Sequence, residues 1–255
     1  MKKFAIGLIV VFLLSSLPVV AESLDGKEIM EKVDSVLKAD EKYMEEEMIL
    51  YTSSNTTRKR TVSVWNKRVD DMNKMLLRFN APADIKGTGF LMEGDDMWLY
   101  LPALGREKRV AGSAKQGNFM GSDLTYEDMQ TLGNTGFSGD YSPALLEKSE
   151  FNGKDAYLLK LIPENEESAY SKLKMWVDTE IYLPLHIVYY DRDGEEYKQL
   201  TTRNHKEIDG KWTATELEMK NLKKGTKTVL KVNEVDFNSS IDDNVFTIRF
   251  LERGN

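Results

Sequence analysis

The sequence predicts a mainly β (α+β) fold, in which an antiparallel meander of about ten strands follows one N-terminal helix. Three observations predict this class for a chain of 255 residues. Apolar residues recur at helical spacing near the beginning of the chain, and the spacing changes to two from Tyr43 onward. Glycine-containing turn signals then separate β-rich runs, and consecutive hairpins pair their strands antiparallel. A sheet of this size must curl, close or split to bury its apolar face.

The predicted helix covers residues 26–38. Asp25 is a suitable N-cap, and Glu28 stands three residues later, as in a capping box. The apolar residues that follow recur at helical spacing, and they are Ile29, Met30, Val33, Val36 and Leu37. We therefore expect an amphipathic helix with one apolar stripe.

Alternating apolar and polar residues predict the strands. The clearest cases are residues 73–79 and 172–178, where every second side chain is apolar. Glycine after a short polar residue supplies the positive φ that a tight hairpin needs. The expected hairpin turns are Asn152-Gly153, Asp193-Gly194, Asp209-Gly210 and Lys224-Gly225.

Residues 102–143 differ from the rest of the chain because they hold 7 of its 17 glycines. Within them, residues 123–132 are predicted to form a short helix, with Ser122 or Asp123 as its N-cap. A long glycine-rich excursion in a compact domain is usually a functional loop or a lid. The alternative is an ordinary surface loop.

The first 21 residues have the pattern of a cleavable signal peptide. Lys2 and Lys3 precede an apolar run of about 11 residues, and small residues lie just before Glu22. The run is too short for a comfortable membrane span. We therefore expect a single domain over residues 22–255, exported to a bacterial periplasm. Because no cysteine follows the signal, lipidation of the new N-terminus is not expected.

Composition and motifs exclude several classes of function. The absence of cysteine rules out disulfides and thiol nucleophiles, and the net charge of −7 argues against nucleic-acid binding. His186 and His205 lack the spacing of a zinc-protease motif, and no serine lies in a nucleophile elbow. The acidic runs at 45–47 and 166–167 are interpreted as solvated charge. We therefore expect no metal, no cofactor and no enzymatic activity.

Several segments in this order resemble a known family. They are residues 78–91 (RFNAPADIKGTGFL), 98–104 (WLYLPAL) with the basic stretch to Val110, 119–128 (FMGSDLTYED), and 175–178 (MWVD) followed by Pro184 and Leu185. Together they resemble the outer-membrane lipoprotein-sorting proteins of the LolA/LolB-like superfamily, in particular its larger and mostly uncharacterised branch. The resemblance covers nearly all of the chain after residue 21.

The resemblance implies an unclosed, strongly curved antiparallel sheet, a half-barrel, whose mouth is covered by helices. It also implies a periplasmic carrier that holds acyl chains of a lipid or lipoprotein in the concave cavity. Such a monomeric carrier would contact a membrane or a membrane transporter transiently. Two alternatives remain: a lipid- or peptide-sensing or protein-interaction module on the same fold and, less expected, a hydrolase.

Three sets of candidate residues follow from this resemblance and from the alternation of the strands. The expected cavity residues are Met75, Leu77, Phe79, Phe90, Met92, Trp98, Tyr100, Leu173, Met175, Val177, Leu217 and Met219. The expected covering residues are Ile29, Val33, Leu37, Leu124 and Met129, and the candidates for contact with an anionic head group are Arg106, Lys108 and Arg109. Periodicity alone leaves open which face of the 97–101 strand points inward.

Overall fold

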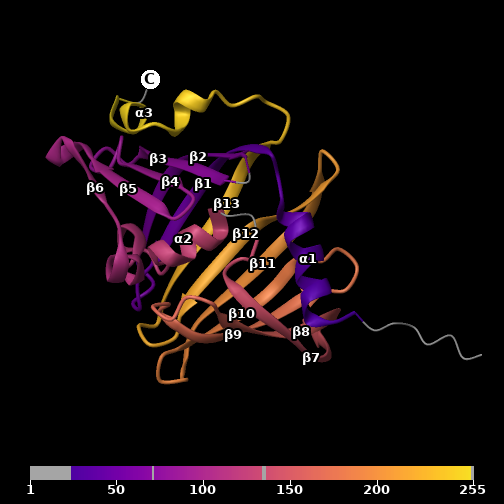
Figure 1. Ribbon diagram of the computed structural model, residues 1–255. Helices are drawn as coiled ribbons and strands as arrows, with labels where there is room; N and C mark the ends of the chain where they lie inside the picture. The colour runs from indigo at the N-terminus through magenta and orange to yellow at the C-terminus, as the bar shows by residue number, and fades with distance from the viewer. Residues whose placement is uncertain (1–23, 71, 134–135, 254–255) are drawn as a thin grey trace, which may run out of the picture.

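The computed structural model describes residues 24–70, 72–133 and 136–253. The expected signal peptide, residues 1–21, lies outside the described residues. The described chain forms one 13-stranded antiparallel sheet with few helices, which confirms the predicted fold class (Figure 1). The strands are β1 (Glu41–Tyr51), β2 (Thr57–Val69), β3 (Met72–Ala81), β4 (Gly89–Glu93), β5 (Asp96–Leu101), β6 (Arg106–Arg109), β7 (Tyr141–Phe151), β8 (Lys154–Pro163), β9 (Tyr170–Asp178), β10 (Pro184–Asp191), β11 (Glu196–Ile208), β12 (Lys211–Asn221) and β13 (Thr226–Asp236).

The strand count of about ten was too low. One strand that the alternation does not reveal is β6, which consists of four exposed charged residues and has no apolar face. It nevertheless pairs with β5 along its whole length. A charged edge strand is a common protection against pairing with another chain, which explains why it lacks the usual pattern.

The sheet consists of two meanders joined at its centre. The strand order is β6-β5-β4-β3-β2-β1-β13-β12-β11-β10-β9-β8-β7, so β1 pairs with β13 and the edges are β6 and β7. The two edges do not meet, and the sheet is strongly curved (Figure 1). The connection from β6 to β7 contains η2 (Gly112–Gln116), η3 (Phe119–Gly121) and α2 (Tyr126–Gly133), and it lies across the concave side.

The four predicted hairpin turns lie between consecutive strands. Asn152-Gly153 joins β7 to β8, and Asp209-Gly210 joins β11 to β12. All four glycines have positive φ, between 65° and 84°. The glycine signals therefore correctly predicted four of the six turns that join the strands from β7 to β13.

The first cover of the concave side is α1 (Gly26–Leu37). The expected capping box is present, since the Glu28 amide donates to Asp25 Oδ1 at 2.9 Å and the Asp25 amide donates to Glu28 Oε2 at 2.8 Å. Ile29, Met30 and Val33 are completely buried against the sheet. A Cβ on Gly26 would lie 2.6 Å from the Leu145 amide nitrogen, so this helix begins directly against edge strand β7.

The second cover, α2, begins later than predicted. Its capping residue is Thr125 rather than Ser122 or Asp123: Thr125 Oγ1 accepts from the Asp128 amide at 3.0 Å. The Thr125 amide in turn donates to Asp128 Oδ2 at 2.7 Å. The Asp123 carboxylate instead accepts from hydroxyl groups on β13, including that of Thr228 at 3.0 Å, and Ser122 bonds within its own turn. Both predicted caps are therefore engaged elsewhere.

The C-terminal segment covers part of the convex face, which the sequence analysis did not predict. It consists of η4 (Asp243–Phe246) and α3 (Ile248–Arg253), and it packs on the outer side of β3 and β4 (Figure 1). Arg78 Nη2 donates to the backbone carbonyls of Phe250 and, at 3.1 Å, Leu251. A Cβ on Gly89 would lie 2.6 Å from Leu251 Cδ1, so the C-terminal segment packs closely on β4 at this point.

Candidate functional site

An apolar cavity of about 210 Å³ lies on the concave side of the sheet. Its floor is formed by β1–β3 and β10–β13, and its sides by the C-terminal end of α1, by α2 and by the chain that follows α2. Among the predicted residues, Met75, Leu77 and Leu217 line it from the sheet, while Leu37 and Met129 line it from the two covers. The cavity therefore lies where helices and sheet meet, inside the main hydrophobic core.

The other inward-facing candidates are buried in the same core without lining this cavity. They are Phe79, Phe90, Met92, Leu173, Met175, Val177 and Met219. In the first meander the reason is the β6–β7 connection, which fills the concave side. Phe119 packs against Phe79 at 6.1 Å between ring centroids, and it meets Phe90 edge-on at 5.3 Å. The glycine-rich excursion therefore acts as a plug over β3 and β4.

Trp98 and Tyr100 do not lie in the cavity, so their assignment was wrong. They are on the convex face, where they pack with Leu76 and Leu91 against the C-terminal segment. The alternate residues of the same strand, such as Met97, belong to the main core. Alternation places these two sets on opposite faces, but only the C-terminal cover shows that the outer set is also packed.

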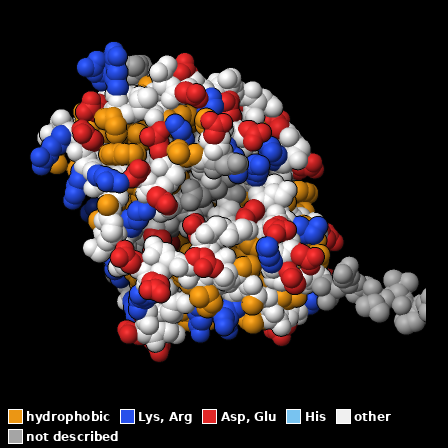
Figure 2. All heavy atoms as spheres, in the orientation of Figure 1, with side chains coloured by type: hydrophobic (Ala, Val, Ile, Leu, Met, Phe, Trp, Pro, Cys, Tyr) orange, Lys and Arg blue, Asp and Glu red, His pale blue; other side chains and the backbone are white. Residues whose placement is uncertain are grey.

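The remaining covering residues are buried as expected of helices on a concave face. Ile29 and Val33 of α1 are completely buried, and so is Leu124, just before α2. The basic residues Arg106 and Lys108 are exposed on edge strand β6, where Lys and Arg side chains gather in Figure 2. Arg109 on the same strand is paired with the Asp96 carboxylate. None of the three lines the cavity, and their contact with a head group stays a prediction.

A buried polar network fastens α2 to the sheet. Lys198 of β11 is completely buried, and its Nζ lies 3.2 Å from Asp128 Oδ2 and 3.3 Å from the Tyr170 hydroxyl. The Tyr170 hydroxyl donates to Asp128 Oδ1 at 2.7 Å. Burial and the neighbouring Asp128 carboxylate raise the pKa of Tyr170 well above its ordinary value. Sequence reasoning missed this network, although the Thr125-to-Asp128 spacing of a capping box pointed to one member.

Two ionisable side chains line the apolar cavity from β1. Glu46 is only 9% exposed, so the interpretation of residues 45–47 as solvated charge was wrong for this residue. Burial raises the pKa of Glu46, and burial also lowers the pKa of Lys42, four residues earlier on the same strand. The alternation of Lys42, Met44, Glu46 and Met48 on one strand face was the signal that could have revealed them.

The chain is similar in sequence and structure to known proteins. The family model of an uncharacterized protein matches residues 71–253, more than half of the chain. A crystal structure from Vibrio parahaemolyticus, named as an outer membrane lipoprotein-sorting protein domain, is 33% identical. The match covers 89% of this chain and 98% of that one, with a TM-score of 0.83. The chain belongs to this lipoprotein-sorting family. The resemblance of the sequence motifs is thereby confirmed.

Two further crystal structures resemble this member of the family. A DUF1329 family protein from Desulfovibrio piger is 29% identical, with 89% of this chain and 97% of that chain covered and a TM-score of 0.83. A LolA superfamily protein from Nitrosomonas europaea shares the fold at 22% identity, with 89% and 100% covered and a TM-score of 0.75. A search of the curated proteins finds no match.

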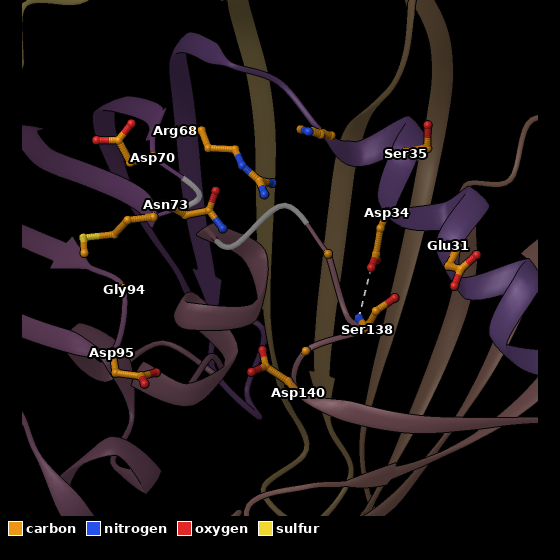
Figure 3. Close-up of a pocket in the computed structure, with 14 residues that line it drawn as sticks. Glu31, Asp34, Ser35, Arg68, Asp70, Asn73, Gly94, Asp95, Ser138 and Asp140 are labelled. Atoms are coloured by element: carbon orange, nitrogen blue, oxygen red, sulfur yellow. Dashed lines mark hydrogen bonds between the residues drawn. The ribbon is translucent and has the colours of Figure 1, made fainter.

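A larger groove of about 790 Å³ opens beside α1, but it is polar (Figure 3). Glu31, Asp34 and Ser35 line it from the helix, and Asp95 and Asp140 line it from the opposite side. Asp34 already has partners, because its carboxylate accepts from the Phe137 amide at 2.7 Å and the Ser138 amide at 3.0 Å. These hydrogen bonds join α1 to the chain that follows α2 along one side of the groove.

The two histidines are held by threonines. His186 Nδ1 lies 2.9 Å from Thr201 Oγ1, and His205 Nε2 lies 2.8 Å from Thr202 Oγ1. Burial lowers the pKa of both imidazoles. Within the described ranges, no group of three or more His, Cys, Asp or Glu residues is arranged to hold a metal ion. None of the described helices is long and apolar enough to cross a membrane.

Proposed function

We propose that this protein is a periplasmic carrier that binds acyl chains of a lipid or lipoprotein and moves them between membranes or to a transporter. The observation that carries the proposal is the apolar cavity between α1, α2 and the concave sheet, with Leu37, Met75 and Leu217 in its lining. Membership of a family named for lipoprotein sorting supports the same conclusion.

The task requires a hydrophobic environment that water cannot supply. Each CH₂ group removed from water contributes about 0.8 kcal/mol, so a sixteen-carbon chain loses roughly 12 kcal/mol when it leaves a membrane for water. A carrier must offset most of this free energy and still release its cargo. A cavity lined by leucine, methionine and valine provides the apolar contacts, and helices that are not part of the sheet provide a cover that can move.

The carrier proposal requires a cover that moves, because the cavity is small. At about 210 Å³ it is smaller than the ~300–1,000 Å³ of most ligand sites. Binding a long chain therefore requires α1 or α2 to shift outward. We assign this motion to α1, because the described part of it is attached to the sheet mainly through apolar side chains, whereas α2 is fastened by the buried network of Asp128, Lys198 and Tyr170.

The cavity also borders the surface at a residue suited to a lipid boundary. Trp212 of β12 lies in the lining and is 38% exposed. Its ring is amphipathic, and tryptophan favours the interface between water and membrane. We assign the approach to the membrane to this end of the cavity.

The test uses mature protein purified from the periplasm without detergent, analysed by native mass spectrometry with solvent extraction of any adduct. The blocking variant is Leu217→Trp, which places a large ring in the cavity. Its matched control is Leu146→Trp, the same substitution at a position on β7 that is 48% exposed. Thermal melting checks that both variants fold.

We expect the wild type and Leu146→Trp to carry a stoichiometric lipid or acylated peptide, and Leu217→Trp to carry less than a tenth as much. A clean mass for the wild type, persisting after incubation with membrane vesicles, contradicts the carrier proposal and favours a protein-binding role. Undiminished lipid in folded Leu217→Trp contradicts the assignment of the cavity.

A further inference from the structure

The cavity contains polar groups that a purely hydrocarbon ligand would leave unsatisfied. Lys42 on β1 and Asn66 on β2 are directly opposite each other in the sheet, and both line the cavity. Asn66 is only 4% exposed. In the described part of the chain, neither side chain has a hydrogen-bond partner, and Lys42 interacts with Glu46 only through the attraction of their opposite charges, without a close ion pair. Lys42 is half-buried and Asn66 is buried, and polar groups withdrawn from water in this way normally have partners.

The charges of the lining determine which partner fits. The ionisable residues that line the cavity are Lys38, Lys42, Lys211 and Glu46. Three cations therefore face one carboxylate, although the whole chain carries a net charge of −7. Lys211 already donates to the Lys38 carbonyl at 3.3 Å, and its ammonium lies over the Phe237 ring. Lys38 is exposed at the C-terminal end of α1, so among the described lining cations Lys42 remains as the one whose ammonium is available inside the cavity.

Glu46 does not replace this missing partner. It stands four residues further along β1, and Met44 lies between the two on the same face. Burial raises the pKa of Glu46, which reduces its repulsion of a bound anion, and the positive charge of Lys42 opposes this shift. The apolar lining, with Leu77, Leu200 and Leu230, extends alongside these polar groups.

We infer that the ligand is an amphiphile with a negatively charged group, a carboxylate or a phosphate, next to its acyl chain. Lys42 and Asn66 bind that group as a cross-strand pair, while the chain occupies the apolar part of the cavity. An ammonium and an amide give charge-assisted and neutral hydrogen bonds to the same oxygens, and such bonds are worth most where water is excluded. This inference rests on the proposed carrier function and names the class of its cargo.

The experiment compares two probes that differ only in charge. Delipidated mature protein is titrated with cis-parinaric acid, a fluorescent eighteen-carbon carboxylate, and with its methyl ester. The variants are Lys42→Met, Lys42→Gln and Asn66→Leu. The matched control is Lys220→Met, the same substitution at an exposed position on β12.

We expect the wild type to bind the acid about tenfold more tightly than the ester. Lys42→Met and Lys42→Gln should abolish this preference by weakening acid binding, with ester binding unchanged. Asn66→Leu should reduce the preference about threefold, and Lys220→Met should leave it intact. Because Lys42→Met removes a half-buried charge from an apolar site, it should retain or raise the melting temperature.

The outcomes separate the two proposals. If the wild type binds neither probe, the carrier function itself fails. If it binds acid and ester equally, or if the Lys42 variants lose both to the same extent, the carrier function stands and the anion site is overturned. Competition by lysophosphatidic acid against monoacylglycerol then identifies the source of the charge: strong competition by the first supports a lipid phosphate, and its absence supports a free fatty acid.

Discussion

The two helices that cover the concave face are held by different kinds of contact. α1 buries Ile29, Met30 and Val33 against the core, and its described polar contacts include those of Asp34 to two backbone amides. α2 is joined to the sheet through a buried carboxylate that contacts a buried ammonium and a buried phenol. Both helices border the same cavity, but only one brings a charge into the core.

The type of contact determines which cover can move at a low cost in free energy. Apolar contacts are not directional, so a helix that slides on them loses contact area gradually. Separating the members of a buried ion pair has a high cost in free energy, because it leaves an unpaired charge in an apolar environment. We therefore interpret α2 with its preceding segment as a fixed plug, and α1 as the cover that opens.

The largest effect should follow from breaking the network under α2. Lys198→Met leaves Asp128 buried without its cation, and the free energy of unfolding should fall by about 3–5 kcal/mol. Urea unfolding measures this change. Lys220→Met is the surface control, since that residue is exposed on β12 and its substitution should change stability by no more than about 0.5 kcal/mol. A loss below 1 kcal/mol for Lys198→Met would contradict the fixed-plug interpretation.

A smaller effect is expected where α1 begins on the sheet. Gly26→Ala places a Cβ 2.6 Å from the Leu145 nitrogen, which forces the helix away from β7. We expect a loss of about 2 kcal/mol, the usual size for overpacking, although alanine itself favours helices. Gly139→Ala is the control, because a Cβ there meets nothing within 4 Å. Equal stabilities of the two variants in thermal melts would show that this contact does not anchor α1.

A third change tests motion directly. The chain has no cysteine, so Asp34→Cys with Gly136→Cys introduces a single pair of thiols. A Cβ on Gly136 would lie 2.7 Å from Asp34 Cγ, which places the two positions within reach of a disulfide. We expect the oxidised protein to take up cis-parinaric methyl ester at least about tenfold more slowly than the same protein after reduction, a change of roughly 1.4 kcal/mol. Equal uptake rates would mean that α1 need not open.

The smallest effect concerns the charge within the cavity. Burial raises the pKa of Glu46 above its ordinary value of 4.5, so the unfolded chain releases this proton at lower pH than the folded protein. Stability is therefore lost as pH rises above that value, and Glu46→Gln should be more stable than the wild type at pH 7 by about 1 kcal/mol. The difference should become small near pH 4, where Glu46 is mostly protonated in the folded and the unfolded state. Chemical denaturation at both pH values checks this, and a difference independent of pH would contradict it.

Local patterns in the sequence determined much of this protein. The capping box of Asp25 and Glu28, the alternation of Met75, Leu77 and Phe79, and the glycine turns depend on neighbouring residues, so they could be interpreted without the fold. The motifs between residues 78 and 128 indicated the family, and the family implied the half-barrel. Of the residues predicted for the cavity and its cover, Met75, Leu77, Leu217, Leu37 and Met129 line the proposed cavity.

Only the tertiary structure decided how the two faces of the sheet are used. An alternating pattern of side chains does not distinguish the two faces of a strand. It therefore could not show that Trp98 faces outward beneath the C-terminal segment. Asp128 and Lys198 are 70 residues apart, and no local pattern joins them. Glu46 looks solvated in a run of three glutamates, yet the strand turns it inward and its two neighbours away. Burial depends on what the rest of the chain places over each side chain, which is why these features emerge only from the packed fold.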